Sequence, residues 1–236
     1  MRTSDQISDT RTGTTATARS MRLLVTGASG VLGRALAPVA EASGHRLEMP
    51  SHAELDLFDP AAVACAARGV DAILHLATRI QPLEQLGNAG AWRENDRLRA
   101  DASRILVNAA LAANVQAYVQ PTVTFVYPPG DPASEDTAIT EVSPILESAL
   151  AAERETDRFA RGGRRGVVLR FGLLDGPGTG HDTPVPALGA TLHVADAARA
   201  LLSALTVPSG IYNVCRNHER ISNERFKQAA GSVPRN

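Results

Sequence analysis

The sequence predicts an α/β fold in which helices cover both faces of one doubly wound parallel sheet. Two observations lead to this prediction. Apolar runs of strand length alternate along the chain with segments of helical length, which is typical of a parallel sheet that is covered on both sides. A chain of 236 residues that is 44% hydrophobic can also bury such a core as a single domain.

The expected elements follow one another in the alternating order of such a fold. Asp59-Pro60 is a good cap and first-turn pair for a helix, and Ser43-Gly44 marks the end of the preceding one. The expected strands cover residues 22–26, 46–49, 72–77, 117–120, 166–172 and 210–214. The expected helices cover residues 32–42, 60–68, 94–114, 143–161, 194–205 and 222–230.

The domain organisation predicted from composition is simple. Residues 1–20 are polar and rich in threonine, so we expect a disordered N-terminal extension. Residues 21–236 should form one domain, because the chain shows neither an internal repeat nor an interdomain linker. Only about twenty residues separate Gly172, at the end of the fifth expected strand, from His193, just before the next expected helix. We therefore expect a short C-terminal substrate lid near residues 173–193.

Charge and cysteine usage exclude several classes of function. The net charge of −1 creates no field that would attract DNA or an anionic membrane, and no apolar run approaches the ~20 residues that a membrane span needs. Cys65 and Cys215 lie in apolar surroundings and imply neither a disulfide framework nor a metal cluster. We therefore expect a cytoplasmic monomer or homodimer with no metal, nucleic-acid or membrane partner.

A glycine-rich turn after the first expected strand is the strongest motif. Gly27 permits a tight turn, Gly30 lets the backbone approach a pyrophosphate, and Gly33 removes a side chain where helix meets sheet. The turn opens a helix, whose N-terminal N–H groups favour phosphate, and so predicts a Rossmann-type dinucleotide site. The residues expected to hold the cofactor here are Gly27, Ser29, Gly30, Val31, Leu32 and Gly33.

The G-x-x-G-x-x-G spacing resembles that of the extended and atypical short-chain dehydrogenase/reductases, the NAD-dependent epimerase/dehydratase family. The resemblance implies a nicotinamide dinucleotide cofactor, with Asp56 and Leu57 near its adenine and with Leu76, Ala77 and Thr78 along its path. Further segments match family landmarks in the right order: residues 54–57, 70–77, 169–172, 176–178, 192–200 and 210–214.

The end of the second expected strand bears on the choice of cofactor. NAD enzymes usually place an acid there for the ribose 2′-hydroxyl, whereas this chain has Ser51 followed by His52. Ser51 and His52 could donate hydrogen bonds to a 2′-phosphate, and Arg34 could add positive charge. We therefore expect NADP(H) in preference to NAD(H); the alternative is that His52 is only a solvated loop residue.

The family's catalytic triad of Ser/Thr, Tyr and Lys is missing at the expected positions. On the family pattern, Val123 stands at the hydroxyl position, Ile145 at the tyrosine position and Ala149 at the lysine position. Lys227 is the single lysine, so no Tyr-x-x-x-Lys pair exists in the sequence. Arginine cannot replace a lysine as a tuned acid, because it does not release its proton.

Three hydroxyl residues remain as catalytic candidates. Thr122 or Thr124 could hydrogen-bond a substrate carbonyl, although threonine also suits a strand end. Tyr127 could be a displaced acid, but a packed aromatic is the more ordinary interpretation. His75 is expected to pack beside the cofactor rather than to titrate in catalysis.

These observations favour an NADPH-dependent ketoreductase of the atypical short-chain type. In the absence of a protein acid, a phenol of the substrate would stabilise the oxyanion that hydride transfer creates. The short lid suits a bulky metabolite such as an aromatic polyketide, which suggests a role in antibiotic biosynthesis; the chain resembles the family's angucyclinone ketoreductases in this respect. Two alternatives stay open: a non-catalytic NADP-binding regulator, and a sugar-nucleotide reductase or epimerase.

Overall fold

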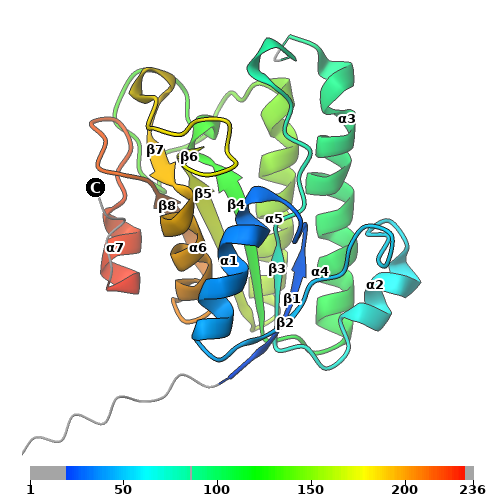
Figure 1. Ribbon diagram of the computed structural model, residues 1–236. Helices are drawn as coiled ribbons and strands as arrows, with labels where there is room; N and C mark the ends of the chain where they lie inside the picture. Colours follow the sequence, from blue (N-terminus) through cyan, green and yellow to red (C-terminus); the bar gives the residue numbers. More distant parts are fainter. Residues whose placement is uncertain (1–19, 86, 232–236) are drawn as a thin grey trace, which may run out of the picture.

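The structure, a computed structural model, describes residues 20–85 and 87–231 and has one parallel sheet at its centre (Figure 1). Six strands lie in the order β2-β1-β3-β4-β5-β8 and all pair in parallel, which confirms the predicted α/β architecture. These strands are β1 (Arg22–Thr26), β2 (Arg46–Glu48), β3 (Ala72–His75), β4 (Ala117–Val123), β5 (Arg165–Phe171) and β8 (Gly210–Val214).

Helices cover both faces of this sheet (Figure 1). Helices α1 (Val31–Ala42) and α6 (Val194–Ser203) pack together on one face. On the other face, α4 (Ser103–Ala112) packs against both α2 (Pro60–Ala66) and α5 (Glu147–Arg161). The remaining helices are α3 (Ala89–Arg97), which leads into α4, and α7 (Glu224–Ala230), which packs beside β8 at the sheet edge.

The two-sided burial follows from the strand sequences. Leu23 and Val25 of β1 belong to the apolar cluster that includes Leu36 of α1, whereas Leu24 belongs to the opposite cluster with Phe159 of α5. Successive side chains of a strand point to opposite faces, so a strand buried on both sides must be apolar throughout. The apolar run at residues 22–26 therefore encodes a central strand.

The helix expected at residues 94–114 differs from the prediction in its start and in its regularity. It begins at Ala89 and contains a π-helical segment, η2 (Leu98–Ala102), between α3 and α4. A π turn inserts one residue and weakens the local hydrogen-bond ladder. Nε2 of His75 lies 3.0 Å from the Leu98 carbonyl oxygen and hydrogen-bonds it. Apolar periodicity alone could not reveal this inserted residue.

The lid region near residues 173–193 contains a small second sheet that the sequence did not predict. Its strands are β6 (Leu173–Asp175) and β7 (Thr191–His193), which pair in parallel. Arg216, just after β8, bonds both Asp175 and the Thr191 hydroxyl and ties this sheet to the domain. Short 3₁₀ turns were also not predicted: η1 (Leu83–Gln85), η3 (Thr124–Val126), η4 (Pro144–Leu146) and η5 (Pro186–Leu188).

The expected extension at residues 1–20 lies, apart from Ser20, outside the described residues. Within the described ranges, no helix is long and apolar enough to cross a membrane. No group of three or more His, Cys, Asp or Glu side chains in these ranges could hold a metal ion.

Candidate active site

The glycine turn lies where the sheet reverses its strand order. The chain passes from β1 to β2 on one side and then to β3 on the other side of β1, which creates a crevice at the carboxyl ends of the strands. Gly27 has a φ of +72°, and a Cβ there would lie 2.5 Å from Ala77. A Cβ on Gly33 would overlap the Ala28 backbone. These two glycines are required by the turn itself.

Gly30 is different, because the fold does not require it to lack a side chain. Its φ of −71° is open to any residue, and a Cβ would meet only the Gly27 carbonyl oxygen at 3.1 Å. Gly30 is also the N-cap of α1, and no side chain caps the N–H groups of the first turn. Gly30 is exposed, and the uncapped helix terminus beside it fits the pyrophosphate of a dinucleotide.

The segment after β2 holds a carboxylate that the sequence analysis did not weigh. Both the backbone N–H and the hydroxyl of Ser51 donate to Oε2 of Glu54, each over 2.8 Å. These hydrogen bonds lower the pKa of the Glu54 carboxyl. The Ser51 hydroxyl, expected to be available for a 2′-phosphate, is thus already engaged by Glu54, whereas the His52 side chain is exposed. Arg34 donates to the Ser29 carbonyl, and its guanidinium lies close to Gly178 of the expected lid region.

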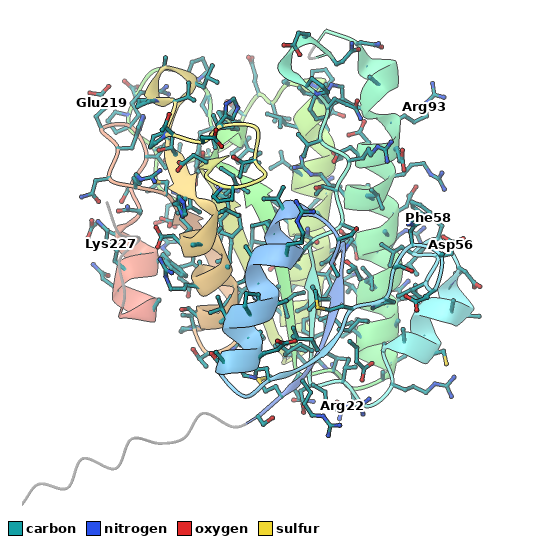
Figure 2. All side chains as sticks on the ribbon, in the orientation of Figure 1. Arg22, Asp56, Phe58, Arg93, Glu219 and Lys227 are labelled. Carbon is teal, nitrogen blue, oxygen red and sulfur yellow. The ribbon has the colours of Figure 1, made fainter. Side chains whose placement is uncertain are left out.

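The expected adenine segment runs beside α2. Asp56 accepts a hydrogen bond from the Phe58 N–H over 2.9 Å, and the Arg97 guanidinium lies 4.0 Å above the Phe58 ring. Figure 2 shows Asp56 and Phe58 together at this edge of the molecule. Leu57 is half-buried beside them. After β3, Leu76 and Ala77 are buried and Thr78 is exposed.

A buried polar network occupies the carboxyl ends of β4 and β5. Arg170 makes two hydrogen bonds to the Glu153 carboxylate, 2.9 Å from Nε to Oε1 and 2.6 Å from Nη2 to Oε2. The Thr122 hydroxyl donates to Glu153 over 2.8 Å. Arg170 also donates to the Tyr127 hydroxyl over 2.7 Å, and that hydroxyl donates to Asn213 over 2.8 Å. Two of the three candidate hydroxyls are therefore committed to internal partners.

The surroundings of Tyr127 do not favour release of its proton. Burial raises the pKa of the Tyr127 phenol, although the charge and hydrogen bond of Arg170 act in the opposite direction. Thr124 is buried in η3, and Val123 precedes it at the position where the family carries its hydroxyl. None of these residues forms a relay to a lysine.

The two positions predicted to correspond to the family's tyrosine and lysine carry apolar side chains. Ile145 lies half-buried in η4, and Ala149 is fully buried in α5. Lys227 is on α7, at the opposite edge of the molecule from Asp56 (Figure 2). Its ammonium donates to Asn217 over 2.8 Å and to Glu224 over 2.6 Å. The lysine therefore serves the α7 edge and not the crevice.

His75 lies beneath the crevice as a neutral, structural residue. Its Nδ1 lies 2.6 Å from the Thr26 hydroxyl, and its Nε2 bonds the Leu98 carbonyl of the π segment. Burial lowers the pKa of His75 to about 4. A neutral ring that donates from Nε2 and accepts at Nδ1 satisfies both contacts.

Four buried polar residues that bear on the site were not among the predicted site residues. Glu153 and Arg170 form the ion pair described above, and Asn95 and Arg99 lie on α3 and the π segment. A signal for one of them was present, because Arg170 interrupts the apolar run of β5.

Comparison with known proteins places this geometry in a family. Residues 23–191 match the model of the NAD dependent epimerase/dehydratase family. The chain belongs to this family. A curated relative from a Streptomyces species, named 3-diazoavenalumate denitrifying reductase, is 30% identical to this family member over 78% of the chain and 72% of the relative. The predicted family and its nicotinamide dinucleotide cofactor are thereby confirmed, while the preference between NAD and NADP stays a prediction.

Solved structures show the same fold. RMD from Pseudomonas aeruginosa complexed with NADPH has a TM-score of 0.75 and 21% identity, covering 92% of this chain and 94% of that one. MoeE5 in complex with UDP-glucuronic acid and NAD has a TM-score of 0.72 and 20% identity, covering 91% and 94%. At these identities, the likeness extends to the Rossmann-type fold alone.

Proposed function

We propose that this family member is an NADPH-dependent reductase that acts without a proton donor from the protein. The observation that carries the proposal is the state of the candidate hydroxyls. Thr122 donates to Glu153 and Tyr127 donates to Asn213, while Ala149 replaces the lysine that would lower the pKa of an acid. When bound, the reduced nicotinamide supplies a hydride, so the acceptor must tolerate hydride addition without help from a protein acid.

The cofactor is proposed to lie with its pyrophosphate over Gly30 and its adenosine beside Asp56 and Leu57. Its 2′-phosphate would meet His52 and the guanidinium of Arg34. Glu54 lies on the same segment, and its hydrogen bonds from Ser51 favour the ionised carboxylate. This negative charge would repel the 2′-phosphate. The preference for NADP(H) should therefore be moderate and easily reversed.

Substitution of Ser51 tests this preference. We expect wild-type protein to bind NADPH more tightly than NADH, and Ser51→Asp to lower the NADPH:NADH affinity ratio at least tenfold, or about 1.4 kcal/mol. The reason is repulsion between the 2′-phosphate and a second carboxylate beside Glu54. Glu54→Gln removes charge and should raise the ratio. Fluorescence titrations of both cofactors measure it, and equal affinities in the wild type would contradict the proposal.

The first substrate class that we propose is an aromatic diazo compound. The Streptomyces relative is named for denitrification of such a group. A hydride added to the terminal nitrogen of an arenediazonium ion gives a neutral diazene, Ar–N=N–H. This species loses N₂ and leaves Ar–H, so atoms and charge balance without any added proton. A site without a free acid suits this chemistry.

The second class is the ketone of an aromatic polyketide. The short lid, with β6 and β7 as its core, favours a bulky acceptor, and a phenol of the substrate beside the ketone would stabilise the oxyanion. Sugar-nucleotide reduction or epimerisation is disfavoured by the same lid. A regulator would bind NADPH but oxidise it with neither class of acceptor.

Removal of the Tyr127 hydroxyl tests whether the protein supplies the proton. Side-chain acids typically contribute roughly 10²–10⁴-fold to the rate. We therefore expect Tyr127→Phe, and Thr122→Val or Thr124→Val, to lower kcat by less than ~100-fold. Single-turnover NADPH oxidation is followed with 3-diazoavenalumate and with an ortho-hydroxyaryl ketone. The matched control is Tyr212→Phe, which removes a hydroxyl that donates to the Pro208 carbonyl.

A loss above ~10³-fold in Tyr127→Phe, with NADPH affinity unchanged, would identify Tyr127 as a displaced acid and end the proposal. For the ketone, methylation of the substrate phenol should slow reduction more than any of these substitutions. For the diazo compound, methylation of a phenol should have little effect. The two classes are thus distinguished by the same experiment.

A further inference from the structure

The π segment carries a buried guanidinium with an unsatisfied hydrogen-bond donor. Arg99 is 4% exposed, and its Nε makes no hydrogen bond. Among the described residues, the side chain of Arg99 has neither a hydrogen bond nor an ion pair within 4.0 Å. Burial lowers the pKa of the guanidinium, whereas the charges of Asp96 and Glu153 act on it in the opposite direction. Arginine nevertheless keeps its charge in proteins, so the site holds a buried cation with an unsatisfied N–H donor.

A second unsatisfied donor lies one turn earlier on the same face. Asn95 is fully buried; its Oδ1 accepts from the Arg79 N–H over 3.0 Å, but its Nδ2 has no partner. Arg79 follows β3, on the segment where the cofactor is expected to pass. Asn95 therefore lies against this segment, and both Asn95 and Arg99 carry unpaired N–H groups. Buried donors without acceptors are rare in native proteins and call for a ligand.

The position of Arg99 relative to α5 explains why it can remain buried. The π segment packs against α5, and Ala149 and Glu153 lie one turn apart on the buried face of that helix. Ala149 leaves out the long side chain that the family carries there. Both Glu153 oxygens are already bonded, to Arg170 and to Thr122, so Glu153 acts on Arg99 through its charge and not through a hydrogen bond.

We propose that Arg99 and Asn95 bind a carboxylate of the substrate. The guanidinium presents parallel N–H donors that match the two oxygens of a carboxylate, and the Asn95 amide adds a further donor. This inference deepens the proposed function by naming an aromatic carboxylic acid as the substrate class. Binding of the acid compensates the buried charge and holds the aromatic ring at the carboxyl edge of the sheet.

Benzoate and its neutral analogue benzamide test the site in the complex with NADP⁺. Trp92, the single tryptophan, lies on α3 one turn before Asn95 and reports binding by its fluorescence. We expect benzoate to bind at least tenfold more tightly than benzamide. Arg99→Met should abolish this difference, and Asn95→Asp should reduce it, because the new carboxylate keeps the Arg79 contact but competes for Arg99. Arg104→Gln, an exposed arginine of α4, is the matched control.

Thermal stability separates a binding role from a structural one. An unpaired buried charge destabilises a fold, so Arg99→Met should leave the Tm unchanged or raise it. A structural role would predict a lower Tm. NADP⁺ affinity should stay unchanged, which distinguishes a substrate site from a cofactor site.

Several outcomes would overturn the inference. The first is equal binding of benzoate and benzamide, or no benzoate binding at concentrations up to about 10 mM. The second is an unchanged benzoate affinity in Arg99→Met. The third is a loss of NADP⁺ affinity in that variant. A failure of the proposed reductase function can be distinguished from a failure of this inference. If the acid binds through Arg99 but no acceptor is reduced, the binding site stands and the reductase proposal falls.

Discussion

Gly30→Val is expected to abolish cofactor binding while the fold stays intact. A Cβ at Gly30 meets only the Gly27 carbonyl oxygen at 3.1 Å, so the free protein tolerates the side chain with a small adjustment. The two methyl groups of valine would occupy the space above the α1 terminus that a pyrophosphate needs. We expect NADPH affinity to fall tenfold or more, or at least ~1.4 kcal/mol, in a fluorescence titration.

Two other glycine substitutions make this test specific. Gly33→Val would overlap the Ala28 backbone and should lower the Tm and the yield of folded protein. Gly87→Val has no neighbour within 4 Å and should change neither stability nor affinity. An unchanged NADPH affinity in folded Gly30→Val protein would remove the glycine turn from the cofactor site.

Arg170→Met should cause the largest loss of stability of any single substitution considered for this chain. Arg170 and Glu153 are 4% and 6% exposed, and removal of the arginine would leave a buried carboxylate without its cation. Such a change typically costs about 3–5 kcal/mol. Urea unfolding followed by circular dichroism measures the free energy of unfolding.

An exposed ion pair on α5 provides the control for this effect. Arg161 and Asp157 lie 3.0 Å apart with side chains 72% and 61% exposed, so Arg161→Met should change the free energy of unfolding by only about 0.3–0.5 kcal/mol. The double substitution Arg170→Met, Glu153→Met removes both buried charges and should recover part of the stability. A loss below ~1 kcal/mol in Arg170→Met would show that water reaches Glu153 and relieves its burial.

Much of the fold could be predicted from the sequence because its signals are local. The apolar runs that became β1 and β8 have the predicted bounds, and the glycines of the first turn have positions that a Rossmann-type turn requires. The two strands of the lid could not be predicted, since each has three residues and depends on pairing with a distant segment.

The candidate site was harder to predict because its polar groups find their partners across the fold. Thr122 and Tyr127 were recognised as hydroxyls near the strand ends, but their partners Glu153 and Asn213 lie 31 and 86 residues further along the chain. Arg99 looks in the sequence like one more surface arginine of a helix. Its burial follows from the inserted residue of the π segment, which apolar periodicity does not register.

Because of the π segment, the side chains of α3 that face the interior depend on the number of residues in this segment as well as on their identity. Each residue of a regular α-helix turns it by about 100°. Loss of one residue within Leu98–Ala102 would rotate all of α3 by this angle relative to α4, so that Trp92 and Asn95 would leave the interior and the Leu98 carbonyl would leave His75. A single inserted or deleted codon could thus exchange a whole face of side chains in one evolutionary step, with no substitution at any of them.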